Sequence, residues 1–261
     1  MTNNFYQSYV NNILTKDDYI VNNILPSLYN LYDYVVIYFD GNKWKLVLLD
    51  IMTSYPILYD TYQNNEKTYD ITIALCPISL RSVVFKGKFK IKTYDNTIML
   101  LTDDNNNILP IDLGQKLNTN NIMLSNRRSE IKIMILKEAL IYTSDPLFIT
   151  TDKKYVKNNT YYNDMLNYNN EIIPDGLIHP KTLVYIIQYK SIKKDEKKYS
   201  IIISKNYKNN IVSGYNFKND GYISYLAEFQ TKIINRDGFI FPCLWYIAKL
   251  SYPNSRIVYI I

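Results

Sequence analysis

Short apolar runs separated by turn-forming residues are the feature that most constrains the fold of this chain. The clearest pair, residues 34–39 and 44–49, flanks Asp40-Gly41-Asn42-Lys43, in which Gly41 can adopt the positive φ of a tight turn. Apolar runs of this length bounded by turns are typical of β-strands. The segment therefore predicts a β-hairpin. All the apolar runs are well short of the ~20 residues that a membrane-spanning helix needs.

The same pattern continues as far as residue 113. Residues 69–75 and 82–85 predict a second hairpin-like unit around the turn 76–79. The segment 34–113 is therefore predicted to be dominated by strands. Further short strands are expected at 89–92, 97–101 and 108–111, and the turn between the last two is rich in Asp and Asn.

A short amphipathic helix is predicted near the N-terminus. Thr15 is a typical N-cap residue, and Asp17-Asp18 supplies the acidic side chains favoured in a first helical turn. Apolar residues between 19 and 25 would form its buried face, and Pro26 would end it. Residues 1–33 are therefore expected to form an N-terminal helical segment.

The order hairpin, helix, proline, strand occurs twice along the chain. In the first half a helix at 136–142 ends before Asp145-Pro146, and a strand is predicted at 147–149. In the second half the corresponding predictions are a hairpin of residues 182–189 and 199–203, a helix at 243–250, Pro253 and a strand at 256–260.

The predicted class is thus α+β and β-rich, with two related halves, each of antiparallel strands followed by a short helix, Pro and a closing strand. The halves are assigned to residues 34–150 and 180–261, with a connecting segment at 151–179. The two halves could also form one domain.

The composition indicates the cellular location and source of the protein more than it indicates an activity. The excess of 30 Lys+Arg over 24 Asp+Glu permits contact with nucleic acid without demanding it. Two cysteines, Cys76 and Cys243, without a C-x-x-C spacing, exclude a disulfide framework and favour a reducing, intracellular setting. The N-terminus lacks the pattern of a signal peptide, so an unprocessed soluble protein is expected. The 27 tyrosines and seven glycines are typical of an AT-rich genome and resemble proteins of large DNA viruses such as mimiviruses.

Few residues suggest chemistry. His179 is the only histidine, so a catalytic triad would have to use it, with Cys76, Cys243 or a serine as nucleophile. No G-x-S-x-G, G-x-x-x-x-G-K-[ST] or G-x-G-x-x-G motif supports catalysis or phosphate binding, and a single histidine is a poor basis for zinc. No metal or cofactor is therefore predicted. Asp103 and Asp104 could act as an acid and base pair, but their asparagine neighbours favour a solvated turn.

A row of lysines offers a second type of site. Four lysines alternate with Phe85, Phe89 and Ile91 on predicted strands, so that they fall on one strand face. Such a face could contact phosphates of a nucleic acid. It could equally be the solvent side of an amphipathic strand or an edge guarded against aggregation. The row consists of Lys86, Lys88, Lys90 and Lys92.

Several segments resemble, in order, an uncharacterised prokaryotic family of unknown function. The family shows a Tyr-Pro segment, a Cys-Pro-x-Cys-x-Ser-x-x-x-Phe strand-turn-strand, a Ser-Asp-leucine strand that ends in Tyr-Asp, a His-Pro-Lys segment and a closing Trp-rich helix, Pro and strand. The corresponding residues here are Tyr55-Pro56-Ile57, residues 73–85 with Cys76-Pro77-Ile78-Ser79, residues 96–103, residues 175–184 with His179-Pro180-Lys181, and residues 245–258.

The departures from that family bear on chemistry. Its second motif cysteine corresponds to Ser79, and a tryptophan expected after the acidic turn is replaced near Leu109. A lone Cys76 cannot form a local disulfide or a dithiolate site, so the resemblance implies that any such chemistry has been lost. What it leaves is a polar ligand site lined by Cys76, Ser79, Asp103 and His179.

The first hypothesis is accordingly a non-enzymatic structural or interaction protein of an AT-rich organism or large DNA virus, located inside the cell or in the virion. Its abundant tyrosines suit interfaces with a protein partner, because the ring adds rigid area with a polar end. The alternatives are a small-ligand binder or enzyme that uses the Cys76–Ser79 turn with His179, and a nucleic-acid-binding protein that uses the lysine row.

Overall fold

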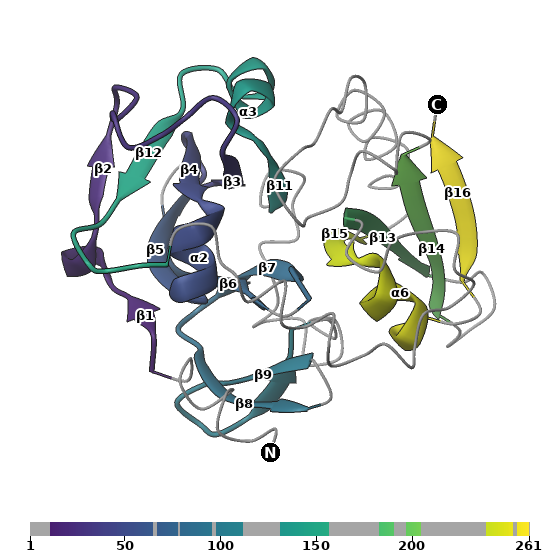
Figure 1. Ribbon diagram of the computed structural model, residues 1–261. Coiled ribbons are helices and arrows are strands. Elements are labelled where there is room, and N and C mark those ends of the chain that lie inside the picture. The colour runs from purple at the N-terminus through teal and green to yellow at the C-terminus, as the bar shows by residue number, and fades with distance from the viewer. Residues whose placement is uncertain are drawn as a thin grey trace. The chain divides into compact units, whose positions relative to one another are not determined.

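The computed structural model describes residues 11–64, 67–77, 79–95, 98–111, 131–156, 183–190, 197–204, 239–252 and 255–260. The chain forms two compact units, Met1–Lys157 (unit 1) and Asn158–Ile261 (unit 2). The described residues of both units lie mainly in strands, with a few short helices (Figure 1), so the β-rich character predicted from the sequence is confirmed. Among the described residues, no helix is long and apolar enough to cross a membrane.

The main sheet of unit 1 is built on the predicted hairpin, β3 (Tyr34–Phe39) and β4 (Trp44–Leu48), whose turn holds Gly41 at φ +101°. Every residue of β3 is buried, as expected of a central strand covered on both faces. The predicted helix α3 (Leu136–Tyr142) leads into β12 (Leu147–Thr150), which pairs parallel with β4. The sheet order is β11-β3-β4-β12-β2, with β11 (Lys132–Ile135) and β2 (Ile20–Asn22) at its edges.

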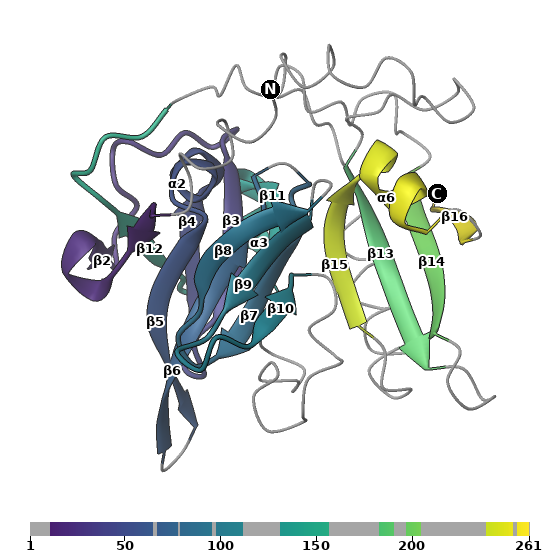
Figure 2. The same cartoon turned by 90° about the horizontal axis from the view of Figure 1, so that it is seen from below.

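The described residues of unit 1 form two further sheets, seen from below in Figure 2. One has the order β1-β5-β6-β7 and contains the predicted 69–75 and 82–85 hairpin as β6 and β7. The other is antiparallel, in the order β10-β9-β8. Their strands are β1 (Ile13–Leu14), β5 (Ile57–Asn64), β6 (Lys67–Leu75), β7 (Ser82–Lys86), β8 (Lys90–Asp95), β9 (Ile98–Thr102) and β10 (Ile108–Pro110). The helix α2 (Leu49–Ser54) connects β4 to β5.

The predicted N-terminal helix is wrong. Thr15 does form a capping interaction with Asp18, whose Oδ2 accepts bonds from the Thr15 amide and hydroxyl, both at 2.8 Å. The helix stops after one 3₁₀ turn, η1 (Lys16–Asp18), and the chain enters β2. The β-branched pair Ile20-Val21 suits a strand, and pairing with β12 satisfies backbone groups that a short helix would leave open.

Unit 2 contains one described sheet, in the order β15-β13-β14-β16. The predicted hairpin is β13 (Leu183–Lys190) and β14 (Lys197–Ser204). The third predicted helix is α6 (Trp245–Ser251), which begins two residues later than expected because Cys243 and Leu244 end β15 (Phe239–Leu244). β16 (Arg256–Ile260) then pairs parallel with β14.

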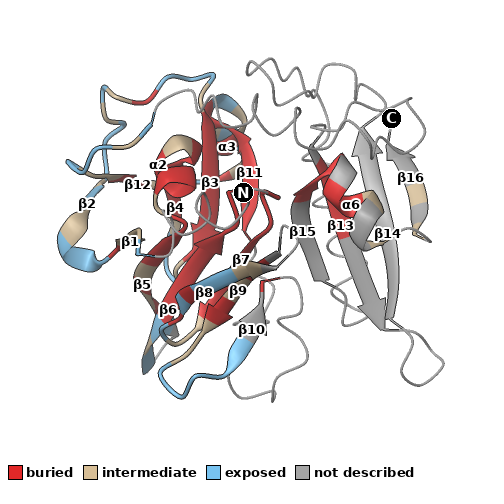
Figure 3. Ribbon diagram, turned by 60° about the horizontal axis from the view of Figure 1, so that its bottom comes forward, coloured by how far each residue is buried: buried red, intermediate tan, exposed pale blue. Residues whose placement is uncertain are grey.

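The buried residues of unit 1, shown in red in Figure 3, lie mainly in β3, β4 and β11, in α2, and in β6 and β7. In unit 2 the described buried residues include Trp245, Ile247 and Ala248 of α6. The helix thus covers its own sheet with an apolar face, the arrangement expected of a layered α+β unit.

Candidate functional site

The structure places Cys76 and Ser79 in one tight turn between β6 and β7. The Cys76 amide donates to the Arg81 carbonyl at 2.7 Å, and the Leu80 amide donates to the Cys76 carbonyl at 2.8 Å. Leu80 adopts φ +58°, an uncommon value for a bulky residue. Cys76, Ser79 and Arg81 are fully buried. The two predicted site residues therefore lie together, but inside the protein.

Asp103 lies elsewhere, in the turn between β9 and β10. Its carboxylate accepts bonds from the backbone amides of Asn105 and Asn107 and from the Asn107 side chain, at 2.9–3.0 Å. The Asn107 side chain is the main reason why the pKa of Asp103 is lowered. These contacts are those of a solvated turn. His179 lies outside the described residues, so its predicted proximity to Cys76 stays a prediction.

The predicted lysine row divides into two pairs. Lys86 lies 4.0 Å from the centre of the Tyr69 ring, and Lys88 forms an exposed ion pair with Asp70 at 3.6 Å. Lys90 and Lys92 are exposed on β8, while the alternating Phe89 and Ile91 are buried. β8 also carries a bulge between Ile91 and Thr93. These last two lysines thus occupy the solvent face of an amphipathic edge strand.

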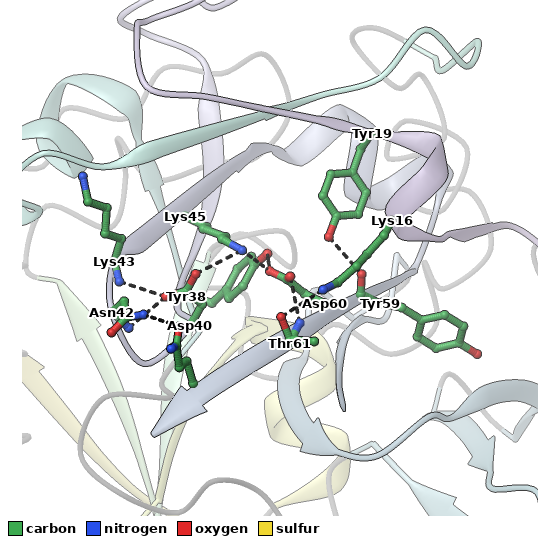
Figure 4. Close-up of polar contacts among 11 residues, drawn as sticks. Lys16, Tyr19, Tyr38, Asp40, Asn42, Lys43, Lys45, Tyr59, Asp60 and Thr61 are labelled. Atoms are coloured by element: carbon green, nitrogen blue, oxygen red, sulfur yellow. Dashed lines mark hydrogen bonds and ion pairs between the residues drawn. The ribbon is translucent and has the colours of Figure 1, made fainter. Parts of the chain in front are cut away.

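A polar cluster of unit 1, drawn in Figure 4, was not predicted. Lys45 of β4 and Asp60 of β5 are 7% and 4% exposed, and Lys45 Nζ lies 2.6 Å from Asp60 Oδ2. Lys45 Nζ also lies 3.1 Å from Asp40 Oδ2. The Tyr38 hydroxyl donates to Asp60 Oδ2 at 2.7 Å. One ammonium group thus lies between two carboxylates, and we call these four residues the buried ionic cluster.

In the buried ionic cluster, backbone amides bind the second oxygen of each carboxylate. The Thr61 amide donates to Asp60 Oδ1 at 2.8 Å, and the Asn42 and Lys43 amides donate to Asp40 Oδ1. Burial, and then the charge of Asp60, raises the pKa of Tyr38, so this hydroxyl stays protonated and keeps donating. The same two causes raise the pKa of Tyr19, whose hydroxyl donates to the Tyr59 carbonyl at 3.0 Å.

The β3–β4 turn is docked onto β5 beside this cluster. The Gln63 amide donates to the Asp40 carbonyl at 2.7 Å, and the Asn42 side chain donates to Gln63 Oε1 at 2.6 Å. A Cβ on Gly41 would lie 1.8 Å from the Gln63 carbonyl oxygen. The buried ionic cluster therefore sits where two sheets are held together, and its donors and acceptors are used in doing so.

A different kind of surface lies along residues 20–32. This segment contains no charged residue, and Tyr29 fixes it to the sheet by donating to the carbonyls of Leu46 and Ile149. The Lys137 amide of α3 donates to the Leu31 carbonyl, so the segment reaches the helix (Figure 1). We call the exposed apolar side chains here the apolar surface: Ile20, Val21, Ile24, Leu25, Leu31 and Tyr32, with Ile141 of α3.

Comparisons of the chain with family models, with curated proteins and with solved structures found no match. The resemblance to the uncharacterised prokaryotic family therefore stays a prediction.

Proposed function

We propose that this chain is a non-enzymatic interaction protein and that the apolar surface of unit 1 binds a protein partner. The observation that carries the proposal is the exposure of large apolar side chains in the segment 20–32, which the fold holds in place: Ile24, for example, is 76% exposed. Ile141 of α3, the helix that this segment reaches, is 82% exposed. Single exposed apolar residues are common, but a run of them without an intervening charge is typical of an interaction site. Tyr32 suits such a site, since tyrosine is enriched in interfaces.

The location of the ionisable groups favours binding over catalysis. Catalytic groups are usually found with a free donor or acceptor directed at a substrate. In the buried ionic cluster, Lys45, Asp40 and Asp60 instead contact one another and the backbone of neighbouring strands. That arrangement stabilises the junction of two sheets, which is a structural role.

We further propose that the two halves of the chain are related modules. Module 1 is β3, β4, β11, α3 and β12, and module 2 is β13, β14, β15, α6 and β16. In module 1, β3 lies between β4 and β11 and pairs antiparallel with both, and β12 pairs parallel with β4. In module 2, β13 lies between β14 and β15 and pairs antiparallel with both, and β16 pairs parallel with β14. Strand order 3-1-2-4 with a helix before the last strand is thus common to both.

The residue register supports this relationship. Ile135 lies opposite Tyr34 and Leu244 lies opposite Leu183, and in both modules the helix starts at the next residue. The two helices are both 7 residues long. Each ends with an amide that donates to the carbonyl of an alanine, Ala139 in α3 and Ala248 in α6, and both alanines are buried.

Photo-crosslinking tests the binding function. A benzophenone amino acid is placed at Ile24 or Ile141 of the full chain, and at Ile108, an exposed isoleucine of β10, as the matched control. We expect positions 24 and 141 to capture the same protein, either a second copy or an identified partner from source cells, and Ile24→Ser to weaken binding of the purified partner. Capture from position 108 alone, or from none of the three, would refute the proposal.

The two alternatives are tested separately. A ligand site at the Cys76–Ser79 turn with His179 predicts that Cys76→Ala abolishes binding of a ligand identified by screening metabolites against the purified chain. Nucleic-acid binding through the lysine row predicts salt-sensitive binding of DNA or RNA that is lost in Lys90→Ser with Lys92→Ser.

A further inference from the structure

We propose that Lys45 and Asp60 react with each other to form an amide bond between their side chains. The bond joins Nζ of Lys45 to Cγ of Asp60 and releases one water molecule, and this condensation needs no oxidant or reductant. It cross-links β4 of the main sheet to β5 of the sheet β1-β5-β6-β7. The inference is independent of the apolar surface, because it concerns a covalent modification within the buried ionic cluster.

The two reacting groups are in contact in the structure, as Figure 4 shows. Lys45 Nζ donates to Asp60 Oδ2 at 2.6 Å. Because Oδ2 is bonded to Cγ, the nitrogen lies less than about 4 Å from that carbon, near the separation of about 3–3.5 Å at which aligned reactants combine. Strands of two different sheets hold the two side chains in place, so the encounter requires little further ordering.

Burial favours the chemical form that the reaction requires. A lysine attacks a carbon atom only as a neutral amine, and a neutral carboxylic acid accepts that attack more readily than a carboxylate does. Transfer of one proton from Nζ to Oδ2 along the hydrogen bond produces both forms at once. The transfer also removes two charges from a site where Lys45 is 7% exposed and Asp60 is 4% exposed, and buried ions are costly.

The other members of the cluster supply the remaining parts of the reaction. Asp40 Oδ2 lies 3.1 Å from Nζ, so this carboxylate can accept a second proton from the nitrogen. The Thr61 amide donates to Asp60 Oδ1 at 2.8 Å and stabilises the negative charge that develops there. The Tyr38 hydroxyl donates to Oδ2, the oxygen that leaves. A structural ion pair needs one carboxylate beside the lysine, whereas this reaction needs two.

The steps balance in atoms and charge. After the first proton transfer, the lone pair of the Lys45 nitrogen forms the bond to Cγ of Asp60, and the π electrons of the carbonyl move to Oδ1. Asp40 takes a proton from the nitrogen. The electrons on Oδ1 then form the carbonyl again while the bond from Cγ to Oδ2 breaks, and Asp40 returns its proton to Oδ2, which leaves as water. One hydrogen stays on the amide nitrogen, and the negative charge stays on Asp40.

Mass spectrometry of the purified full chain tests the proposal directly. We expect the denatured chain to weigh about 18 Da less than its sequence, which is the mass of the water released. Trypsin should fail to cut after the modified Lys45 and should yield a peptide of residues 44–67 that carries this loss. Breaks in its backbone between residues 45 and 60 should release no fragment ions, because the amide bond still joins the two parts.

Matched variants assign the bond to its residues. Lys45→Arg keeps a cation in the cluster but lacks the amine, so its full sequence mass is expected. Lys43→Arg changes a lysine whose side chain is 45% exposed and should retain the loss of water. Asp40→Asn keeps a polar side chain that cannot accept the proton, and it should form the bond at least about tenfold more slowly. Circular dichroism establishes that each variant is folded.

Two results would overturn the proposal. One is the full sequence mass for the wild-type chain after overnight incubation at neutral pH, with normal cleavage after Lys45; the cluster would then act as an ion pair only. The other is a loss of water confined to residues 17–43, which would come from dehydration of Asp40 next to Gly41. Both results are read from the wild-type chain, so neither depends on the folding of a variant.

Discussion

Replacing Lys45 by methionine should destabilise unit 1 strongly, because it leaves the buried carboxylate of Asp60 and the partly exposed carboxylate of Asp40 without their cation. Methionine preserves the length and apolar stem of the side chain, so the change removes the ammonium group with little change in volume. Asp60 would keep its bonds from the Tyr38 hydroxyl and the Thr61 amide, and Asp40 its bonds from the turn amides. Neither carboxylate would retain a positive partner within the buried ionic cluster.

The distances set the scale of the effect. With an effective dielectric constant of about 20, charges 2.6 and 3.1 Å apart attract by about 6 and about 5 kcal/mol. Most of that attraction is offset by the cost of removing the ions from water, which is several kcal/mol each. Breaking a buried pair by deleting one partner leaves that cost unopposed, and about 3–5 kcal/mol of unfolding free energy should be lost.

The assay is urea unfolding of the full chain followed by tryptophan fluorescence. The chain has two tryptophans, Trp44 next to Lys45 in unit 1 and Trp245 in unit 2, so a Trp245→Phe background assigns the signal to unit 1. Lys43→Met is the matched control: Lys43 and Asp145 form an ion pair in which 45% and 74% of the side chains are exposed, so its loss should cost less than about 1 kcal/mol. If Lys45→Met were no more destabilising than Lys43→Met, the structural role of the buried ionic cluster would be refuted.

Three further predictions follow from local geometry. Gly41→Ala should lower the free energy of unfolding in urea by more than about 2 kcal/mol, because the new Cβ would lie 1.8 Å from the Gln63 carbonyl oxygen. Gly87→Ala is the control: Gly87 also has a positive φ, +100°, but a Cβ there would have its nearest neighbour at 3.7 Å, so the loss should be only about 1 kcal/mol. Equal losses in the two variants would contradict the close approach at Gly41. Burial raises the pKa of Tyr38, so the stability that its proton provides is complete below about pH 10 and is lost as the pH rises further. The urea midpoint of the unmodified chain should therefore fall above that pH, and Tyr38→Phe should make this fall less steep. An unchanged slope in the variant would contradict the raised pKa of Tyr38. Cys76 and Cys243 are buried, so a thiol reagent should modify them only at the rate of opening or unfolding, and rapid modification in the native protein would contradict this.

Local sequence signals were sufficient for much of the fold. The β3–β4 hairpin was predicted because its turn and its apolar runs are contiguous in sequence. α3 and β12 were predicted because Pro146 separates a helical pattern from an extended one. β2 was missed because an N-cap signal favours a helix locally, while the pairing with β12 that overrides it comes from residues far along the chain.

The buried ionic cluster was beyond sequence reasoning for a similar reason. Lys45 stands near the start of a strand next to a turn, where a lysine normally faces water. Its burial depends on Asp60, which belongs to β5, a strand that was not predicted. The available signal was that Lys45 is the only charged residue in the apolar run 44–49. For the other predicted site residues, sequence placed Cys76 and Ser79 in one turn correctly but gave no measure of their burial.

The proposed relation between the modules explains why charge is buried in one and need not be in the other. Lys45 lies opposite Leu147 in module 1, and the residue opposite Arg256 in module 2 is Ser200. The carboxylate of Asp60 comes from β5, which lies in the segment between β4 and β11 and is no part of the shared topology. A buried lysine is tolerated only with a partner, so Lys45 is tied to the presence of that segment.

The second buried lysine of module 1 follows the same rule. Lys132 donates to the hydroxyl of Tyr142, the last residue of α3, and its ammonium group lies 4.0 Å from the centre of that ring. Lys132 lies three residues before the end of the third strand of module 1, and Tyr142 is the last residue of its helix. Module 2 has Phe241 and Ser251 at the corresponding positions. Under the proposed relation, both members of the Lys132–Tyr142 pair are replaced in module 2. The ionic contacts therefore belong to the elaboration of unit 1, whereas the apolar helix-on-sheet packing around Ala139 and Ala248 is the part that a common module would require.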